Sequence, residues 1–292
     1  MSVPSGNGAR LPAPFIVGAS RSGTTLLRLM LDAHPAIAIP GETHFYQAVL
    51  AVDPARADWV DAVIGAIVGS HAWADYAMDA EAFARAARAA RPREAADVVR
   101  TFYRMYAARF GKTGWGDKFP GNVPSMRGIA RMLPEARFVH IIRDGRDVAA
   151  SLREMWWRPG DSYASCIEYW AETVRTARAE ARAGFPYHEL RYEDLVRDPE
   201  RELRAICAFL GIAYEPAMLE YHRGARSRIG EMRDWDFFGR FVPREVLIGI
   251  HERTSEPPSA ERVGRWRAEM SEADAAECAR AAGGLLEELG YR

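Results

Sequence analysis

The feature that most limits the fold of this chain is residues 15–30, F-I-V-G-A-S-R-S-G-T-T-L-L-R-L-M. An apolar strand, a loop bounded by Gly18 and Gly23, and an apolar helix follow one another, as in nucleotide phosphate-binding loops. In such loops, backbone N–H groups and the helix N-terminus hold the phosphates. The lysine that usually follows the second glycine is replaced by Thr24. The segment therefore predicts a phosphate-binding α/β protein in which Arg21 supplies the positive charge.

The rest of the chain alternates strands with helices, which predicts a single P-loop-like domain with a central parallel sheet flanked by helices. The expected strands are residues 15–18, 36–40, 137–142 and 187–190, with a loop or short strand at 111–120. The expected helices are residues 24–33, 124–133, 145–157, 162–183, 199–210, 216–222 and 271–289. We expect a loose tail at residues 1–12, the domain at 13–292, and a helical insert at 43–112.

Composition excludes several classes of protein. The net charge of −1 gives no general attraction to nucleic acid or anionic lipid. The sequence contains no run of 18 apolar residues, so it predicts no membrane-spanning helix. Three scattered cysteines indicate a reducing, cytoplasmic compartment. The sequence does not decide between a monomer and a homodimer.

The basic residues are unevenly divided, because only Lys112 and Lys118 of the 39 Lys and Arg residues are lysines. A GC-rich bacterial genome explains the excess of arginine. A lysine that persists under this bias indicates a role for a compact ammonium that a planar guanidinium cannot fill.

Helix and strand lengths make Glu42 a candidate general base. The helix at 24–33 carries the chain about 15 Å away from the loop, and an extended run at 36–40 returns it by about 16 Å. A right-handed parallel crossover would then place residues 41–44 beside the loop. A carboxylate beside bound phosphates needs a reason, and accepting a proton from a nucleophile is one. Capping of the next helix is an equally good explanation of Glu42, and His44 is a rival base.

The ends of the other expected strands carry further candidates. Lys118 follows a glycine-rich run, Arg143 ends the buried strand R-F-V-H-I-I with Ser151 on the next helix, and Tyr192 follows the strand at 187–190. Arg143 and its neighbours Asp144, Arg146 and Asp147 could instead form surface ion pairs of little energetic value. Since the carboxyl ends of parallel strands meet at one edge, their convergence favours a common ligand site.

Four segments together resemble sulfotransferases that use 3′-phosphoadenosine 5′-phosphosulfate (PAPS) and release PAP. Residues 15–27 are similar to their phosphosulfate loop, and I-I-R-D-G-R-D-V-A-A-S, residues 141–151, is similar to their 3′-phosphate motif. R-Y-E-D-L and the following F-L-G, within residues 191–211, and V-G-R-W-R, residues 263–267, resemble later elements of the family. Tyrosylprotein sulfotransferases have the most similar pattern, with their catalytic glutamate at the spacing from Arg21 to Glu42.

The resemblance implies a set of site residues. The implied catalytic residues are Glu42, Arg21 and Lys118. The implied cofactor-binding residues are Ser20, Arg21, Ser22, Gly23, Thr24, Thr25, Arg143, Ser151, Tyr192, Arg262, Gly264, Arg265 and Trp266. Candidate acceptor-binding residues are His44, Phe45, Trp156 and Trp157, with the aromatic stretch 235–241. No metal is implied, since cationic side chains would bear the charge.

The sequence also departs from the family pattern. A further 3′-phosphate arginine would fall near Met155, so either Arg153 or Arg158 replaces it or this contact is absent. A C-terminal serine that assists the sulfuryl group has two candidates, Ser255 and Ser259.

The sequence therefore leaves more than one possible function and more than one possible acceptor. A nucleotide kinase or NTPase, and a catalytically inactive nucleotide-binding protein, are the rival functions. A small molecule, a carbohydrate, a lipid or a peptide tyrosine could supply the acceptor hydroxyl.

Overall fold

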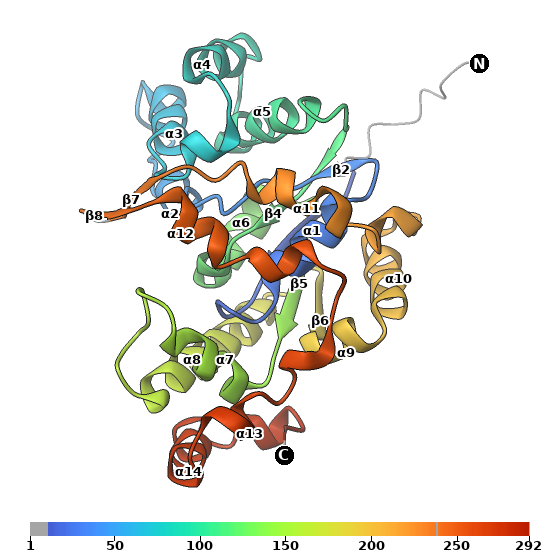
Figure 1. Cartoon of the computed structure of the whole chain (residues 1–292). Coiled ribbons are helices and arrows are strands. Elements are labelled where there is room, and N and C mark those ends of the chain that lie inside the picture. The colour runs from blue at the N-terminus through green and yellow to red at the C-terminus, as the bar shows by residue number, and fades with distance from the viewer. Residues whose placement is uncertain (1–10, 238, 292) are drawn as a thin grey trace.

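The computed structural model describes residues 11–237 and 239–291. Most of the tail predicted at residues 1–12 and Phe238 of the aromatic stretch lie outside the described residues. Figure 1 shows a small central sheet between helices, with α3, α4 and α5 at one end of the molecule and α13 and α14 at the other.

The central sheet has four parallel strands in the order β4-β1-β5-β6. The strands are β1 (Ala13–Val17), β4 (Asp117–Lys118), β5 (Ala136–Ile142) and β6 (Tyr187–Arg191). All five residues of β1 are buried. Phe15 and Val17 pack with the helical insert, whereas Ile16 packs with the helices on the opposite face. The predicted fold class is therefore confirmed, and the four strands end at the same edge of the sheet.

The strand predicted at residues 36–40 does not join this sheet. Only β2 (Ile37–Ala38) is extended, and it pairs in parallel with β3 (Gly114–Trp115) in a separate two-stranded sheet. The strand that pairs with β1 on that side is β4, which follows β3 in the chain. The predicted crossover is therefore wrong in its route, although it returns the chain to the same edge.

Helices account for most of the remaining chain. The α-helices are α1 (Thr24–Asp32), α2 (Tyr46–Leu50), α3 (Trp59–Val68), α4 (Ala80–Ala89), α5 (Ala95–Ala108), α6 (Met126–Met132), α7 (Gly145–Arg153), α8 (Tyr163–Ala181), α9 (Tyr192–Arg197), α10 (Pro199–Leu210), α11 (His222–Ile229), α12 (Arg244–Gly249), α13 (Trp266–Glu269), α14 (Glu272–Ala281) and α15 (Leu285–Glu288). Short 3₁₀ turns are η1 (Trp73–Tyr76), η2 (Pro120–Ser125), η3 (Pro216–Met218), η4 (Glu252–Ser255) and η5 (Ala260–Arg262). The predicted C-terminal helix is broken because Gly283 and Gly284 adopt left-handed conformations.

The region that looked irregular, residues 224–262, contains an antiparallel hairpin, β7 (Trp235–Phe237) with β8 (Arg240–Val242). Figure 1 shows this segment running from α11 past the insert and back across α1 towards α13. Asp75 in the insert fastens it there, because its carboxylate accepts hydrogen bonds from the Arg233 backbone N–H (2.7 Å) and from Trp235 Nε1 (3.0 Å).

Candidate active site

The loop between β1 and α1 has a shape that two glycines make possible. Gly18 has φ of +146°, and a Cβ atom there would lie 2.4 Å from the carbonyl oxygen of Ile141. Gly23 has φ of +99°, and a Cβ atom there would lie 2.5 Å from Cδ2 of Tyr192. Arg21 between them is also left-handed, with φ of 72°. The tight turn expected for a phosphate cradle is therefore present and lies against the ends of β5 and β6.

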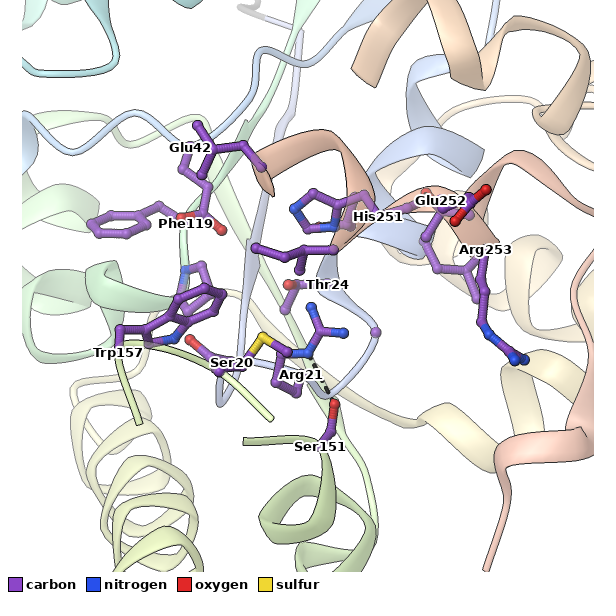
Figure 2. Close-up of a pocket in the computed structure, with 18 of the residues that line it drawn as sticks. Ser20, Arg21, Thr24, Glu42, Phe119, Ser151, Trp157, His251, Glu252 and Arg253 are labelled. Atoms are coloured by element: carbon purple, nitrogen blue, oxygen red, sulfur yellow. Dashed lines mark hydrogen bonds between the residues drawn. The ribbon is translucent and has the colours of Figure 1, made fainter. Parts of the chain in front are cut away.

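Two guanidinium groups lie at this loop, that of the half-buried Arg21 and that of the buried Arg143. Arg21 Nε donates to Ser151 Oγ at 3.0 Å, the dashed contact in Figure 2, and Arg143 donates to the carbonyl of Arg21 at 3.3 Å. Burial, and then the charge of Arg143, lower the pKa of Arg21 to about 10. An anionic ligand would relieve the repulsion between these like charges.

The C-terminal V-G-R-W-R segment is clasped to helix α7 by Asp147. The wholly buried carboxylate of Asp147 accepts hydrogen bonds from the backbone N–H groups of Gly264 (2.7 Å) and Trp266 (3.0 Å). The Arg146 guanidinium lies 3.9 Å from the centre of the Trp266 ring. Gly264 and Trp266 thus hold the segment in place without facing the cavity, whereas Arg262 and Arg265 line it.

The ring of Tyr192, the first residue of α9, lies between the loop and Arg143. Its edge faces Gly23, and the Arg143 guanidinium is 4.7 Å from its centroid. Tyr192 also lines the cavity. An aromatic face in this position suits stacking on a nucleotide base.

Glu42, Lys118 and His44 form a cluster at the edge of the sheet, which we call the Glu42 cluster. Lys118 Nζ, at the end of β4, donates to Glu42 Oε1 at 2.8 Å and lies 3.4 Å from Thr25 Oγ1 at the start of α1. His44 Nε2 is 3.3 Å from Glu42 Oε2. The insert fixes this stretch of backbone, because Tyr76 donates to the carbonyl of Glu42 at 3.0 Å.

Charge pairing in the Glu42 cluster keeps the acid ionised. Burial alone would raise the pKa of Glu42, but Lys118 and His44 outweigh burial and hold that pKa well below its ordinary value. Burial lowers the pKa of Lys118, and Glu42 opposes that shift. Glu42 is therefore a carboxylate near neutral pH, and moving Lys118 towards another anion would make it a stronger base.

These groups surround one cavity of about 800 Å³. Its lining includes the loop residues Ser20, Arg21, Gly23, Thr24 and Thr25, together with Arg143, Ser151 and Tyr192. It also includes Glu42, His44, Trp156 and Trp157. Lys118 and Ser22 are buried directly behind this surface.

The wall opposite the loop is made of rings. The His44 ring centroid lies 4.1 Å from that of His71, 3.9 Å from that of Phe119 and 5.5 Å from that of Trp235. Burial, and then the neighbouring His44, lower the pKa of His71 to about 4, so His71 is uncharged at neutral pH. We call these residues, with Phe237, the aromatic wall.

Some expected positions are not brought to the cavity. Phe45 is fully buried and packs in the core against Tyr46 and Phe102. Arg153 lies over the ring of Tyr163 at 5.2 Å, and Arg158 pairs with Asp161 at 2.8 Å, so neither lines the cavity as a replacement at position 155.

The two C-terminal serine candidates differ in position. Ser255 does not line the cavity. Ser259 does, but it is exposed and its hydroxyl accepts from the Glu261 backbone N–H at 3.2 Å.

Residues that sequence reasoning missed come mainly from segments without a motif. His71 and Asp75 follow α3 in the insert, Phe119 follows Lys118, and His251 follows α12; all four line the cavity. The nearest signal was the position of Phe119 beside a predicted strand end. The other three have no sequence pattern that separates them from packing residues.

Lys112 shows that the persistence of a lysine does not by itself mark a catalytic residue. Its ammonium donates to the backbone carbonyls of Asp32 and of Ile37 (3.0 Å), at the end of α1 and in β2. A single compact cation reaches two carbonyl groups there, which is a structural use of lysine.

Two features are absent from residues 11–237 and 239–291. Their His, Cys, Asp and Glu side chains form no group that could hold a metal ion. None of their helices is both long and apolar enough to cross a membrane.

A parallel sheet whose strand ends surround one cavity with a glycine loop, a buried lysine, an arginine and a tyrosine defines a phosphate-binding α/β enzyme. The model of the family described as "Sulfotransferase family" matches residues 12–216. The chain therefore belongs to the sulfotransferase family. The predicted class, a PAPS-dependent sulfotransferase rather than a nucleotide kinase, is confirmed at this level.

Individual proteins agree with the family match. The chain is 26% identical over 241 residues to a putative protein-tyrosine sulfotransferase of Caenorhabditis briggsae, which covers 80% of this chain and 76% of the worm protein. It is 27% identical over 274 residues to protein-tyrosine sulfotransferase 2 of Gallus gallus, covering 88% of this chain but only 63% of the chicken protein.

The sulfotransferase domain of the Synechococcus PCC 7002 olefin synthase has the same fold. The TM-score is 0.61 at 22% identity, over 99% of this chain and 98% of that domain.

Proposed function

We propose that this chain transfers the sulfuryl group of PAPS to a hydroxyl group of a small aromatic or apolar acceptor, with Glu42 as the base. The observation that carries the proposal is the contact of 2.8 Å between Lys118 and Glu42. Glu42 of this pair lines the same cavity as Arg21 and Arg143. A cation and a proton acceptor are thus available beside a polyanion site.

The residues present fit PAPS. The glycine loop, residues 20–25, would hold the 5′-phosphosulfate, Arg143 and Ser151 the 3′-phosphate, and Tyr192 the adenine. Within the described residues, Ser22 Oγ and Arg143 Nε are buried without a hydrogen-bond partner. Such atoms are costly unless a ligand pairs with them, which supports an anionic ligand here.

PAPS supplies the group that moves: the bond from sulfur to the 5′-phosphate oxygen breaks, sulfur bonds to the acceptor oxygen, and PAP leaves with the electron pair. Arg21 and Lys118 stabilise the negative charge that grows on the departing oxygen. Glu42 accepts the proton of the acceptor hydroxyl. Because Lys118 then turns from Glu42 towards the sulfuryl end, the pKa of Glu42 rises when a base is needed.

The aromatic wall favours a phenol among the possible acceptors. Uncharged rings at 3.9–5.5 Å from His44 offer flat contact surfaces beside Glu42. The relatives named as protein-tyrosine sulfotransferases support a phenolic hydroxyl. A peptide tyrosine is the second candidate, and a nucleic acid acceptor has no support from the net charge of −1.

We place the enzyme in the cytoplasm, since Cys166, Cys207 and Cys278 are all buried and free. The many arginines and alanines are consistent with a bacterial source. Whether it acts as a monomer or a homodimer is open to measurement by light scattering.

The test combines binding with turnover. PAP should raise the melting temperature of the protein, whereas ATP with Mg²⁺ should not. A nucleotide kinase would instead be stabilised by ATP with Mg²⁺ and not by PAP. Incubation with PAPS and a panel of phenols, alcohols and tyrosine peptides should then yield products heavier by one sulfuryl group. PAP binding without any such product would indicate an inactive nucleotide-binding protein instead.

A further inference from the structure

His251 is a histidine at the end of α12 whose backbone is held firmly. Its N–H donates to the carbonyl of Ile248 at 2.9 Å. Its own carbonyl accepts from both the backbone N–H (2.9 Å) and the hydroxyl (2.6 Å) of Thr254. This turn leaves the ring little freedom to point elsewhere.

The His251 ring lies in the cavity, beside the groups that would meet the sulfuryl end of PAPS. Figure 2 shows its imidazole next to Thr24, on the side of the loop that also carries Arg21, whereas Glu252 and Arg253 point away. The charges that act on the ring are those of Lys118, Arg21, Glu42 and Arg28. His251 therefore lines the same cavity as Arg21, Thr24 and Glu42.

The imidazole is neutral and has no partner within the described part of the chain. Burial, and then the positive charges of Lys118 and Arg21, lower the pKa of His251 to about 3. No described residue forms a hydrogen bond with either of its ring nitrogens. A neutral imidazole carries one N–H donor, and here that donor is not used by the protein.

A neutral donor suits this position better than a third cation. Lys118 and Arg21 already supply two positive charges, and another buried charge beside them would be costly. Ser255 does not line the cavity. Ser259 does and keeps a free hydroxyl hydrogen, but it is exposed, whereas His251 is half-buried.

We propose that the N–H of neutral His251 donates a hydrogen bond to the sulfuryl group during transfer, a role that rests on the proposed function. Glu42 remains the base, and the imidazole keeps its proton throughout. His251 thereby completes, with Lys118 and Arg21, a set of donors around the moving group. The C-terminal segment thus takes part in the chemistry as well as covering the cavity.

Two variants separate this role from packing. His251→Phe keeps an aromatic ring of similar size but has no donor, whereas His251→Gln keeps an N–H donor on a flexible chain. With 4-nitrophenyl sulfate and PAP as the probe reaction, we expect kcat of the Phe variant to fall about 100-fold. The dissociation constant of PAP, which lacks the sulfuryl group, should change less than about threefold, and Gln should recover about tenfold of the lost rate.

The outcomes are distinct. A Phe variant with near-wild-type kcat, or one more active than the Gln variant, would overturn the proposal. His222→Phe is the matched control, because His222 lies on the adjoining helix α11 and does not line the cavity; it should leave kcat unchanged.

A binding measurement keeps the inference testable without turnover. In protein labelled with ¹⁵N-histidine, the resonance absent from His251→Gln identifies the ring. PAPS should slow exchange of its N–H proton with water, and PAP should not. If the wild-type protein binds PAPS and this N–H is unaffected, the role of His251 is wrong while the proposed function stands; if it binds neither PAPS nor PAP, the proposed function itself fails.

Discussion

The two sides of the cavity are built in different ways. The donor side, with Arg21, Arg143 and Ser151, comes from a loop and a helix that follow adjacent strands of one parallel sheet. The acceptor side, the aromatic wall, comes from the insert, from the residue after β4 and from the β7–β8 hairpin. The donor side is charged and rich in hydrogen bonds, whereas the acceptor side is neutral and held by ring contacts.

This difference explains how each side relates to its ligand. Phosphate and sulfate groups require cations and N–H donors at fixed positions, so the donor side tolerates few arrangements. Ring contacts have little directional demand, so many residues can form an acceptor wall of similar energy. Short sequence motifs therefore identify the residues that bind the donor, whereas no such motif identifies the residues that select the acceptor.

The largest effect is expected at Glu42, where the two sides meet. Glu42→Gln removes the proton acceptor while keeping the side-chain shape, so kcat should fall about 1,000-fold with PAP affinity nearly unchanged. Rates measured with 4-nitrophenyl sulfate and PAP, and calorimetry with PAP, test this. Glu81→Gln, which changes an exposed acid of α4 that does not line the cavity, is the control. Normal turnover in Glu42→Gln would leave His44 as the base.

Asp75 gives a test of how the acceptor side is held together. Burial raises the pKa of Asp75 to about 6 from an ordinary value of 3.8. The folded state therefore binds this proton more tightly, so its stabilising contribution is full below pH 3.8 and is lost as pH rises through 6. The difference between these two pKa values corresponds to about 3 kcal/mol in the free energy of unfolding.

The measurement is the free energy of unfolding of wild type and Asp75→Asn, which cannot titrate. Their difference should change by about 2 kcal/mol between pH 4 and pH 7, in favour of the variant at the higher pH. Asp79→Asn, an exposed helix cap in the same insert, should follow the wild-type profile, because asparagine also caps helices. Parallel curves for wild type and Asp75→Asn would show that the carboxylate is solvated.

Arg143 tests whether the donor side recognises the 3′-phosphate. Arg143→Ala should weaken PAP binding by about 2 kcal/mol, or roughly 30-fold, because a charge-assisted hydrogen bond is lost. Binding of 5′-AMP, which lacks the 3′-phosphate, should change less than about threefold in the same variant. An equal loss of affinity for PAP and 5′-AMP would show that Arg143 does not contact the 3′-phosphate.

The smallest effect is expected on the acceptor side. His71→Leu removes a ring from the aromatic wall and should raise KM for a phenolic acceptor about fivefold, near 1 kcal/mol, with PAP affinity unchanged. Steady-state rates with 4-nitrophenol and PAPS provide the measurement. A change in PAP affinity would show that the two sides are coupled.

The donor side could be predicted because spacing and strand ends constrain it. Gly18 and Gly23 fix the turn, and the parallel order of β4, β1, β5 and β6 brings Lys118, Arg143 and Tyr192 to one edge. Glu42 reached this edge by a route that the sequence did not predict, since β2 pairs with β3. The roles of these residues stay predictions until variants are measured.

The acceptor side could not be predicted, because no local rule sets which way its side chains face. His44 has φ of 50°, and this left-handed turn precedes Phe45, which faces the core while His44 faces the cavity. His71 and His251 reach the cavity only through tertiary packing of the insert and the C-terminal segment. Their sequence neighbourhoods give no periodicity that separates a cavity residue from a core residue.

The clasp formed by Asp147 has a consequence for biosynthesis. Its carboxylate is wholly buried and takes two backbone N–H groups from residues 264 and 266. While a ribosome is still making the chain, every strand of the central sheet has emerged before those two partners exist. A nascent chain thus carries the glycine loop early but closes its nucleotide pocket only after residues 264–266 have been made.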